Sequence, residues 1–283
     1  MTKISHLLHH FYLGGVAVCV SAAAALPVSA QESASDTARV ASAARQVSAA
    51  ATEHPLVPVI RWAEAGRPKI EAIRDYTAIM QKQENLGGEV QEAQVMEIKV
   101  RHNPFSVYLK FRYPKKMNGQ EAIWVPSQNN GKLIAHGVGL EKSFGTQFID
   151  PEGFIAMRGC KYSIKEMGLL NLVDKLLEVG KKDSKYGECD VTYTEDVKVD
   201  GRVCTLIQVT HPVQRSNFIF YIARIYVDKE TNIPIRYESY DWPAKQGETP
   251  KLLEAYTYLK LNLNTGLTDA DFDYKNPKYD YAK

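Results

Sequence analysis

Histidine and glutamate are the residue types in this sequence best suited to acid–base chemistry. His102, His136 and His211 fall in different predicted strands or strand ends, without the spacing of metal ligands. Glu121 and His136 fall in neighbouring predicted strands, where they could form an acid–base pair or an ordinary cross-strand pair. The chain has no Gly-x-Ser-x-Gly, His-Glu-x-x-His, phosphate-loop or dinucleotide motif. We therefore predict no catalytic residue and no cofactor.

Carboxylates are concentrated near the end of the chain. Asp269, Asp271 and Asp273 alternate with other residues, and Asp280 stands at the twelfth position, as in a calcium-binding loop. However, Tyr274 occupies the sixth position, where such a loop requires glycine. The alternation of acidic and aromatic residues is more typical of an edge strand, so we predict no metal site.

Three cysteines follow the first 30 residues. If Asp200-Gly201 forms a two-residue turn, Cys204 lies opposite Val197 and is too far from Cys189 for a disulfide. Cys160 and Cys189 flank a predicted helix. A bridge between these two residues and three free thiols are both open outcomes.

Most of the chain has the two-residue alternation of half-buried strands. In residues 96–101 and 105–112, apolar and polar side chains alternate strictly, and turn residues such as Gly87-Gly88 separate the segments. The predicted strands are 75–83, 96–101, 105–112, 121–125, 132–137, 191–196, 202–211, 218–227, 234–241 and 252–263. Because no helix stands between most of them, we predict an antiparallel meander.

Two segments have helical periodicity instead. The first has apolar residues at Leu56, Val59, Ile60 and Ala63, and we expect it to end at Gly66 and Pro68. The second covers 164–179 and is expected to end at Gly180. It has one apolar stripe, formed by Leu169, Leu172, Val173, Leu176 and Leu177.

These elements predict the α+β class, with one domain over residues 54–283. We expect a curved antiparallel half-barrel of about ten strands, a short N-terminal helix, and a long internal helix that covers the concave face. No repeat of 20 to 50 residues is present, which excludes a propeller or solenoid.

The N-terminus predicts export. The uncharged run Phe11–Leu26 precedes a small-residue site, so we expect a signal peptide over residues 1–30, cleaved after Ala30. An uncleaved anchor is the alternative, but the run is short for a bilayer span. Val18 rather than a small residue precedes Cys19, which argues against lipidation. Residues 31–53 are rich in Ala and Ser, and we expect a flexible leader there.

The composition excludes a disordered chain and a collagen-like repeat. Hydrophobic residues make up 45% and charged residues 24% of the chain, which is ordinary for a folded protein. The net charge is +2, and removal of Lys3 with the signal peptide leaves +1. A surface that binds duplex nucleic acid is therefore not favoured.

Four segments resemble the LolA-like half-barrel superfamily: 75–80, 103–111, 226–236 and 267–273. That superfamily includes the outer-membrane lipoprotein carrier and the sensor domain of a periplasmic stress regulator. The chain also resembles an uncharacterised family of exported bacterial proteins. The carriers keep an arginine in the strand after their first proline. Counted from Pro104, that position is Tyr108 here, so this chain departs from the carriers at that residue.

The resemblance implies an exported, non-enzymatic protein, periplasmic or secreted, that holds a lipid or a lipoprotein acyl chain. After cleavage we expect no integral membrane segment. The groove residues expected to contact the ligand are Phe105, Val107, Leu109, Phe111, Ile123, Val125, Leu169, Leu172 and Leu176. One alternative is an envelope protein-interaction module whose own helix fills the groove. The other is a secreted hydrolase.

Overall fold

The structure is a computed structural model that describes residues 53–245 and 247–281. The signal peptide, its cleavage after Ala30 and the leader up to residue 52 lie outside these residues and stay predictions. One compact unit begins at Glu53 and contains all the described residues.

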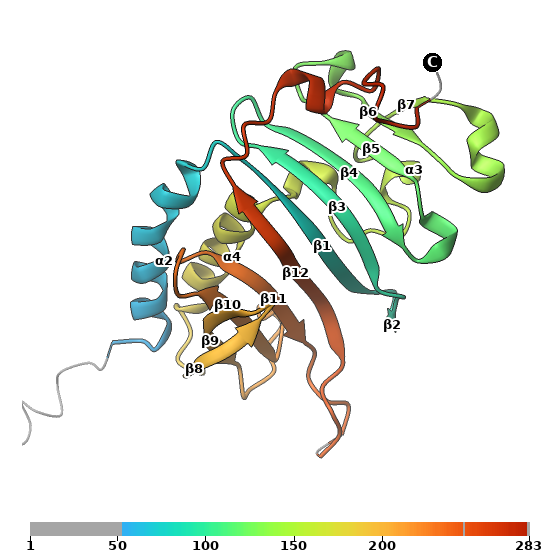
Figure 1. The fold of residues 1–283 in the computed structure, drawn as a ribbon. Helices are drawn as coiled ribbons and strands as arrows, with labels where there is room; N and C mark the ends of the chain where they lie inside the picture. Colours follow the sequence, from blue (N-terminus) through green and yellow to red (C-terminus); the bar gives the residue numbers. More distant parts are fainter. Residues whose placement is uncertain (1–52, 246, 282–283) are drawn as a thin grey trace, which may run out of the picture. The chain divides into compact units, whose positions relative to one another are not determined.

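The described residues form a curved antiparallel sheet of twelve strands (Figure 1). The strands are β1 (Asp75–Leu86), β2 (Glu89–Val90), β3 (Gln94–Arg101), β4 (Ser106–Tyr113), β5 (Glu121–Trp124), β6 (Leu133–His136), β7 (Gln147–Ile149), β8 (Asp190–Val199), β9 (Arg202–Thr210), β10 (Ile222–Asp228), β11 (Pro234–Tyr240) and β12 (Leu252–Leu263). Their order is β7-β6-β5-β4-β3-β1-β12-β11-β10-β9-β8, and β2 pairs with β1 alone. The α+β fold is confirmed, with the short β2 and β7 added to the predicted strands.

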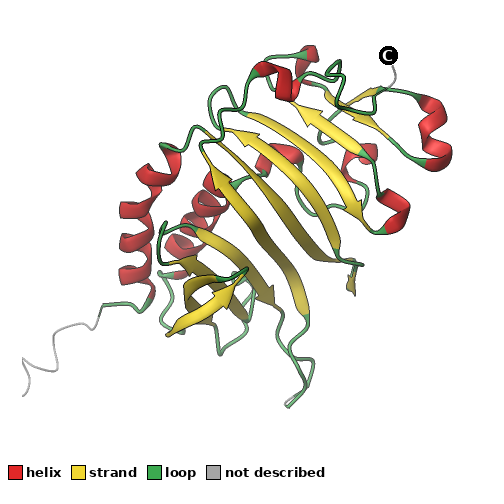
Figure 2. Ribbon diagram, in the orientation of Figure 1, coloured by secondary structure: helices red, strands yellow, loops and turns green. Residues whose placement is uncertain are grey.

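Two helices of similar length pack side by side over one face of this sheet (Figure 2). They are α2 (Leu56–Glu71) and α4 (Leu169–Asp183), and the short α3 (Phe154–Met157) precedes α4. Helix α2 continues past Gly66 and Pro68, so the expected stop there is wrong. Pro68 lies in the last turns, its carbonyl accepts a bond from the Ala72 N–H at 3.0 Å, and the buried Ile70 anchors this end.

The limits of α4 also differ from the prediction. Residues Ile164–Glu166 form a separate 3-10 turn, because Gly168 has φ 113°, a conformation that breaks a helix and favours glycine. Gly180 does not end α4, which runs on to Asp183. A Cβ on Gly180 would lie 3.3 Å from Ile60 Cγ1, so this glycine allows α2 and α4 to approach closely.

Both faces of the sheet carry a core. On the helix-covered face, residues such as Met96, Ile98 and Val107 pack against α2 and α4. On the outer face, Ile123 and Val125 pack beneath the C-terminal segment. Our prediction of an edge strand in that segment is wrong. Residues Asp269–Phe272 form a 3-10 turn instead, because the Phe272 ring is buried against the sheet.

We expect Phe272→Ala to lower the free energy of unfolding by about 3–5 kcal/mol, since it leaves a cavity under the C-terminal segment. The Phe272 side chain is 1% exposed, whereas that of Phe154 is 85% exposed. The matched variant Phe154→Ala should therefore change stability by less than about 0.5 kcal/mol. Urea unfolding measures both, and equal effects would contradict this account of the outer core.

Candidate ligand-binding site

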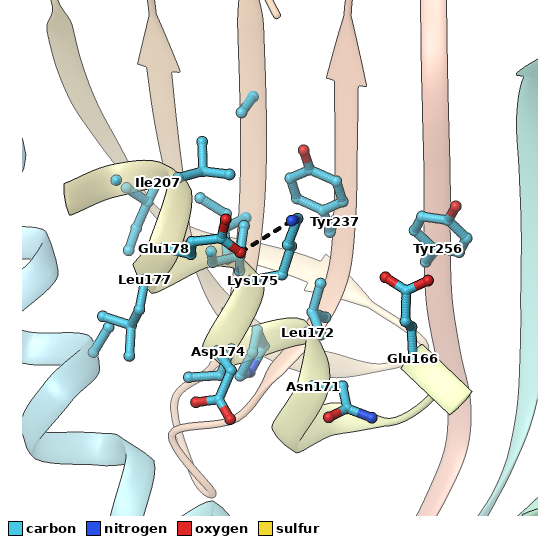
Figure 3. Close-up of a pocket in the computed structure, with 18 of the residues that line it drawn as sticks. Glu166, Asn171, Leu172, Asp174, Lys175, Leu177, Glu178, Ile207, Tyr237 and Tyr256 are labelled. Carbon is cyan, nitrogen blue, oxygen red and sulfur yellow. Dashed lines mark hydrogen bonds and ion pairs between the residues drawn. The ribbon is translucent and has the colours of Figure 1, made fainter. Parts of the chain in front are cut away.

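A cavity of about 440 Å³ lies between α2, α4 and the helix-covered face of the sheet. Its wall is mostly apolar. The apolar wall includes Val59 and Ile60 of α2, Leu172 and Leu176 of α4, and Val209 and Ala223 of the sheet. Tyr237 and Tyr256 project from neighbouring strands toward α4 (Figure 3). The volume is within the range of about 300–1,000 Å³ that is typical of small-molecule sites.

Helix α4 forms one side of this cavity and is fixed at its start and its middle. The backbone N–H of Leu169 donates to the hydroxyl of Tyr76 at 2.9 Å, and that tyrosine is fully buried. Arg67 of α2 donates to both carboxylate oxygens of Asp174, at 2.5 and 3.0 Å. These contacts hold α4 against α2 and against β1.

The end of α4 contributes a buried acid to the wall. Asp183 Oδ2 lies 3.5 Å from His211 Nε2, and both side chains are at most 2% exposed. Burial raises the pKa of Asp183 to about 6 and lowers the pKa of His211. His211 Nδ1 lies 3.2 Å from the Phe220 carbonyl, so Nδ1 carries the hydrogen and Nε2 accepts. A protonated Asp183 can donate to that Nε2 atom.

The predicted groove residues separate into three groups. Leu172 and Leu176 line the cavity. Phe105, Val107, Leu109, Phe111 and Leu169 belong to the core on the helix-covered face, outside the cavity wall. Ile123 and Val125 lie on the outer face, because Tyr108 rather than Val107 is the register partner of Ile123. Ligand contact by any of the nine stays a prediction.

The sequence reasoning missed the part of the wall that comes from α2 and from strands β9 to β11. The apolar stripe of α2 is visible in the sequence as a first signal, but the predicted groove did not include it. The nearly continuous apolar run before and in β10, which supplies Phe220, Ala223 and Ile225, was a second signal. A strand buried on both faces is expected to have such a run.

The candidate acid–base pair forms on the outer face, away from the cavity wall. Glu121 and His136 are register partners on β5 and β6, and their side chains are 3.7 Å apart. Burial opposes ionisation of Glu121, but the neighbouring His136 ring and Lys110 ammonium hold its pKa below the usual value. The neighbouring Glu121 carboxylate raises the pKa of His136. The backbone N–H of Asp280 also donates to Glu121, so the pair fastens the C-terminal segment.

Three of the four C-terminal acids, Asp269, Asp271 and Asp280, are paired with basic residues of the sheet. Asp269 bonds to Arg101 and Asp271 to Lys99, each at 2.7 Å. Asp280 bonds to Lys110 at 2.9 Å. Within residues 53–245 and 247–281, no group of three or more His, Cys, Asp or Glu is arranged to hold a metal ion.

The three described cysteines, Cys160, Cys189 and Cys204, are free thiols. Val197 pairs with Cys204, as the predicted turn at Asp200-Gly201 requires. Burial raises the pKa of the Cys189 thiol to about 12, which keeps this thiol protonated. None of the helices in the described part of the chain has the length and apolar composition to cross a membrane.

We expect Asp183→Asn to stabilise the protein at pH 8 but not at pH 4. A folded-state pKa of about 6 lies above the unfolded value, so ionisation destabilises the fold as pH rises toward 6 and above. A shift of about two pKa units corresponds to at most about 3 kcal/mol. The asparagine amide imitates the protonated acid and donates to His211. The groups facing Asp183 are His211, Lys182, Cys189 and Tyr237.

Chemical unfolding at both pH values measures this effect. The exposed residue Asp190 provides the control, and Asp190→Asn should give no gain at either pH. A gain for Asp183→Asn that is the same at pH 4 and pH 8 would contradict the assignment of a raised pKa.

Several solved structures are similar to this chain at low identity. A LolA superfamily protein from Nitrosomonas europaea is 10% identical, with 75% of this chain and 97% of that chain covered and a TM-score of 0.31. The lipoprotein LppX of Mycobacterium tuberculosis is 12% identical, with 77% and 100% covered and a TM-score of 0.43. The MucA/MucB complex of Pseudomonas aeruginosa is 14% identical, with 77% and 61% covered and a TM-score of 0.44.

A LolA superfamily protein is thus among these structures. Because all three TM-scores are below 0.5, the function proposed below depends on this chain's own residues. No curated protein matches the chain in sequence. The family model described as protein of unknown function (DUF1571) matches residues 73–281. This match covers most of the sequence and confirms the predicted uncharacterised family: the chain belongs to the DUF1571 family.

Proposed function

We propose that this protein is an exported, non-enzymatic carrier that holds the acyl chain of a lipid or lipoprotein in the cavity under α4. The observation that carries the proposal is the apolar wall of that cavity, about 440 Å³ in volume, between two helices and the sheet. This volume lies in the lower part of the usual range for ligand sites, so the cavity suits one acyl chain better than several. Export and a periplasmic or secreted location follow from the predicted signal peptide.

The energetics fit reversible binding. Burying an acyl chain of about 16 carbons gains roughly 0.8 kcal/mol per methylene, or about 12 kcal/mol in total. Association costs on the order of 4–15 kcal/mol. The small difference suits a carrier, which must release its ligand, better than a permanent anchor.

The non-enzymatic assignment is supported by where the acid–base candidates lie. Glu121 and His136 are engaged with each other and with the C-terminal segment on the outer face. His102 lies in the turn after β3, beside the backbone of Glu71 and Ile73. A hydrolase acting on a ligand in the cavity could not use these three residues, because they do not line its wall. Asp183 does line the wall, but its side chain is buried against His211.

A second candidate function is an envelope protein-interaction module. It is favoured by the segment that connects β6 to α4, where Leu140, Phe144 and Phe154 are strongly exposed. In addition, β7 is the last strand in the sheet order. Exposed apolar side chains beside a sheet edge are typical of surfaces that bind another protein.

We expect Leu172→Glu or Leu176→Glu to reduce binding of an alkyl probe by at least tenfold, because each places a carboxylate in the apolar wall. The probe is a fluorescent single-chain 16-carbon lipid, titrated into delipidated protein, and native mass spectrometry of the purified protein checks for co-purified lipid. Leu140 is 92% exposed, so Leu140→Glu is the matched control and should bind like the wild type.

Circular dichroism of each variant checks whether it is folded. Two results would overturn the carrier function: no probe binding and no lipid in the wild type, or undiminished binding by both Leu172→Glu and Leu176→Glu. Loss of an envelope partner in Leu140→Glu, together with no lipid binding by the wild type, would support the interaction module.

A further inference from the structure

The cavity has a polar end where β1, β11 and β12 lie side by side. Glu84 of β1 and Glu254 of β12 are register partners, and both side chains are buried. Tyr256 of β12 and Tyr162 of the loop before α4 stand beside them, and all four residues line the cavity. The apolar space described above therefore ends at two carboxylates and two phenols.

The two carboxylates are neutralised by lysines that are not part of the cavity wall. Lys82 Nζ lies 3.2 Å from Glu84 Oε2, and Lys161 Nζ lies 2.8 Å from Glu254 Oε2. Neither lysine lines the cavity. The two lysine charges therefore balance the two carboxylates at this end of the cavity. The carboxylate oxygens line the cavity, whereas the ammonium groups lie outside its wall.

Glu84 accepts bonds of ordinary length from protein donors, whereas two of the bonds that Glu254 accepts are long. Glu84 accepts bonds from the hydroxyl of Tyr256 at 2.6 Å and from the backbone N–H of Lys161 at 3.0 Å, besides its contact with Lys82. Glu254 Oε1 accepts from Ser239 Oγ and Glu254 Oε2 accepts from the Tyr256 hydroxyl, each at 3.5 Å, which is the limit of a hydrogen bond. Glu254 Oε1 thus retains capacity to accept a bond from a ligand.

The phenols at this end act as hydrogen-bond donors. Burial, followed by the nearby carboxylates, holds the pKa of Tyr256 and of Tyr162 well above the usual range. Both hydroxyls therefore keep their hydrogens at physiological pH. Glu254 is among the groups that raise the pKa values of Tyr162 and Tyr237, so its carboxylate lies near both rings.

The remaining charges of the wall do not favour an anion. Acidic residues outnumber lysines along the cavity, and the two lysines that line it are already paired. Lys165 bonds to Glu152 at 2.7 Å, and Lys175 bonds to Glu178 at 3.0 Å, as Figure 3 shows for the second pair. Burying a charged head group without a free partner is costly, whereas an uncharged hydroxyl needs only a hydrogen bond.

Resting on the proposed function, we infer that the polar end binds an uncharged, hydroxyl-bearing head group, such as that of a monoacylglycerol, with one hydroxyl donating to Glu254. The acyl chain then extends along α4, past Leu172. A fatty acid is disfavoured because its carboxylate is ionised and acidic residues outnumber lysines along the wall. An alkylamine is disfavoured at this end because Glu84 and Glu254 are already paired with Lys82 and Lys161.

The test compares three ligands that share a 16-carbon chain: 1-monopalmitoylglycerol, palmitate and hexadecylamine. Each displaces the fluorescent probe from delipidated full-length protein at pH 8 and at concentrations below self-association. We expect monopalmitoylglycerol to bind at least tenfold more tightly than either charged ligand. Equal affinities would overturn the head-group assignment and leave the carrier function standing, whereas no binding of any ligand would overturn both.

Charge substitutions should change the order of the three ligands. Glu254→Gln leaves Lys161 without its partner, so we expect about tenfold weaker binding of monopalmitoylglycerol and tighter binding of palmitate. Lys161→Met leaves Glu254 unpaired and should favour hexadecylamine. Glu230→Gln changes an exposed acid that does not line the cavity, and this control should keep the wild-type order.

Because the outcome is a change of preference within one variant, a general loss of stability does not produce it. Thermal unfolding identifies any variant that fails to fold. Lys161 is one-third exposed, so Lys161→Met is the variant expected to be tolerated best. Unchanged ligand order in both folded variants would contradict the role of Glu254.

Discussion

The cavity depends on how α4 is held. An amphipathic helix with a leucine stripe gains most by burying that stripe completely, which would leave no space beneath it. Here the start of α4 is fixed by the Tyr76 hydroxyl, and its middle by the paired bonds between Arg67 and Asp174. A Cβ on Gly168 would lie 3.0 Å from that hydroxyl, so the glycine is needed for the contact. Because α4 is fixed to α2 as well as to β1, Leu172 and Leu176 line a space instead of filling it.

The two faces of the sheet use charge differently. On the outer face, Lys99, Arg101 and Lys110 each bond to an aspartate of the C-terminal segment, which covers the second core. Ion pairs that solvent reaches at one partner or both contribute little each, so the buried rings of that core supply most of the stability there. On the helix-covered face, the buried carboxylates Glu84 and Glu254 lie together at one end of the cavity. Glu121 and the C-terminal aspartates were the candidates for acid–base and metal chemistry in the sequence. In the structure they instead help to hold the C-terminal segment on the sheet.

Local sequence patterns predicted most of the helices and strands. Nonlocal packing decides the face of β5, the end of α4 and the polar end of the cavity. Strict alternation gave the positions of β3 and β4, and the Asp200-Gly201 turn correctly placed Val197 opposite Cys204. The face of β5 could not be predicted, because it depends on the register with β4, which pairs Tyr108 with Ile123. The end of α4 at Asp183 was missed for a similar reason: Gly180 normally ends a helix, but here it accommodates Ile60 of another helix. The polar end of the cavity combines residues 84, 162 and 254, which no local pattern connects.

The buried charges at that end are difficult to explain by stability alone. Replacing a buried ion pair with apolar side chains of similar volume is often neutral or stabilising, because desolvation of the charges offsets their attraction. The same space between β1 and β12 could have been apolar, like the wall around Val209 and Ala223. A wholly apolar cavity would bind an acyl chain in either direction. Fixed acceptors and donors at one end give an amphiphile a single orientation, and because they are already balanced by Lys82 and Lys161, they add direction without attracting a charged competitor.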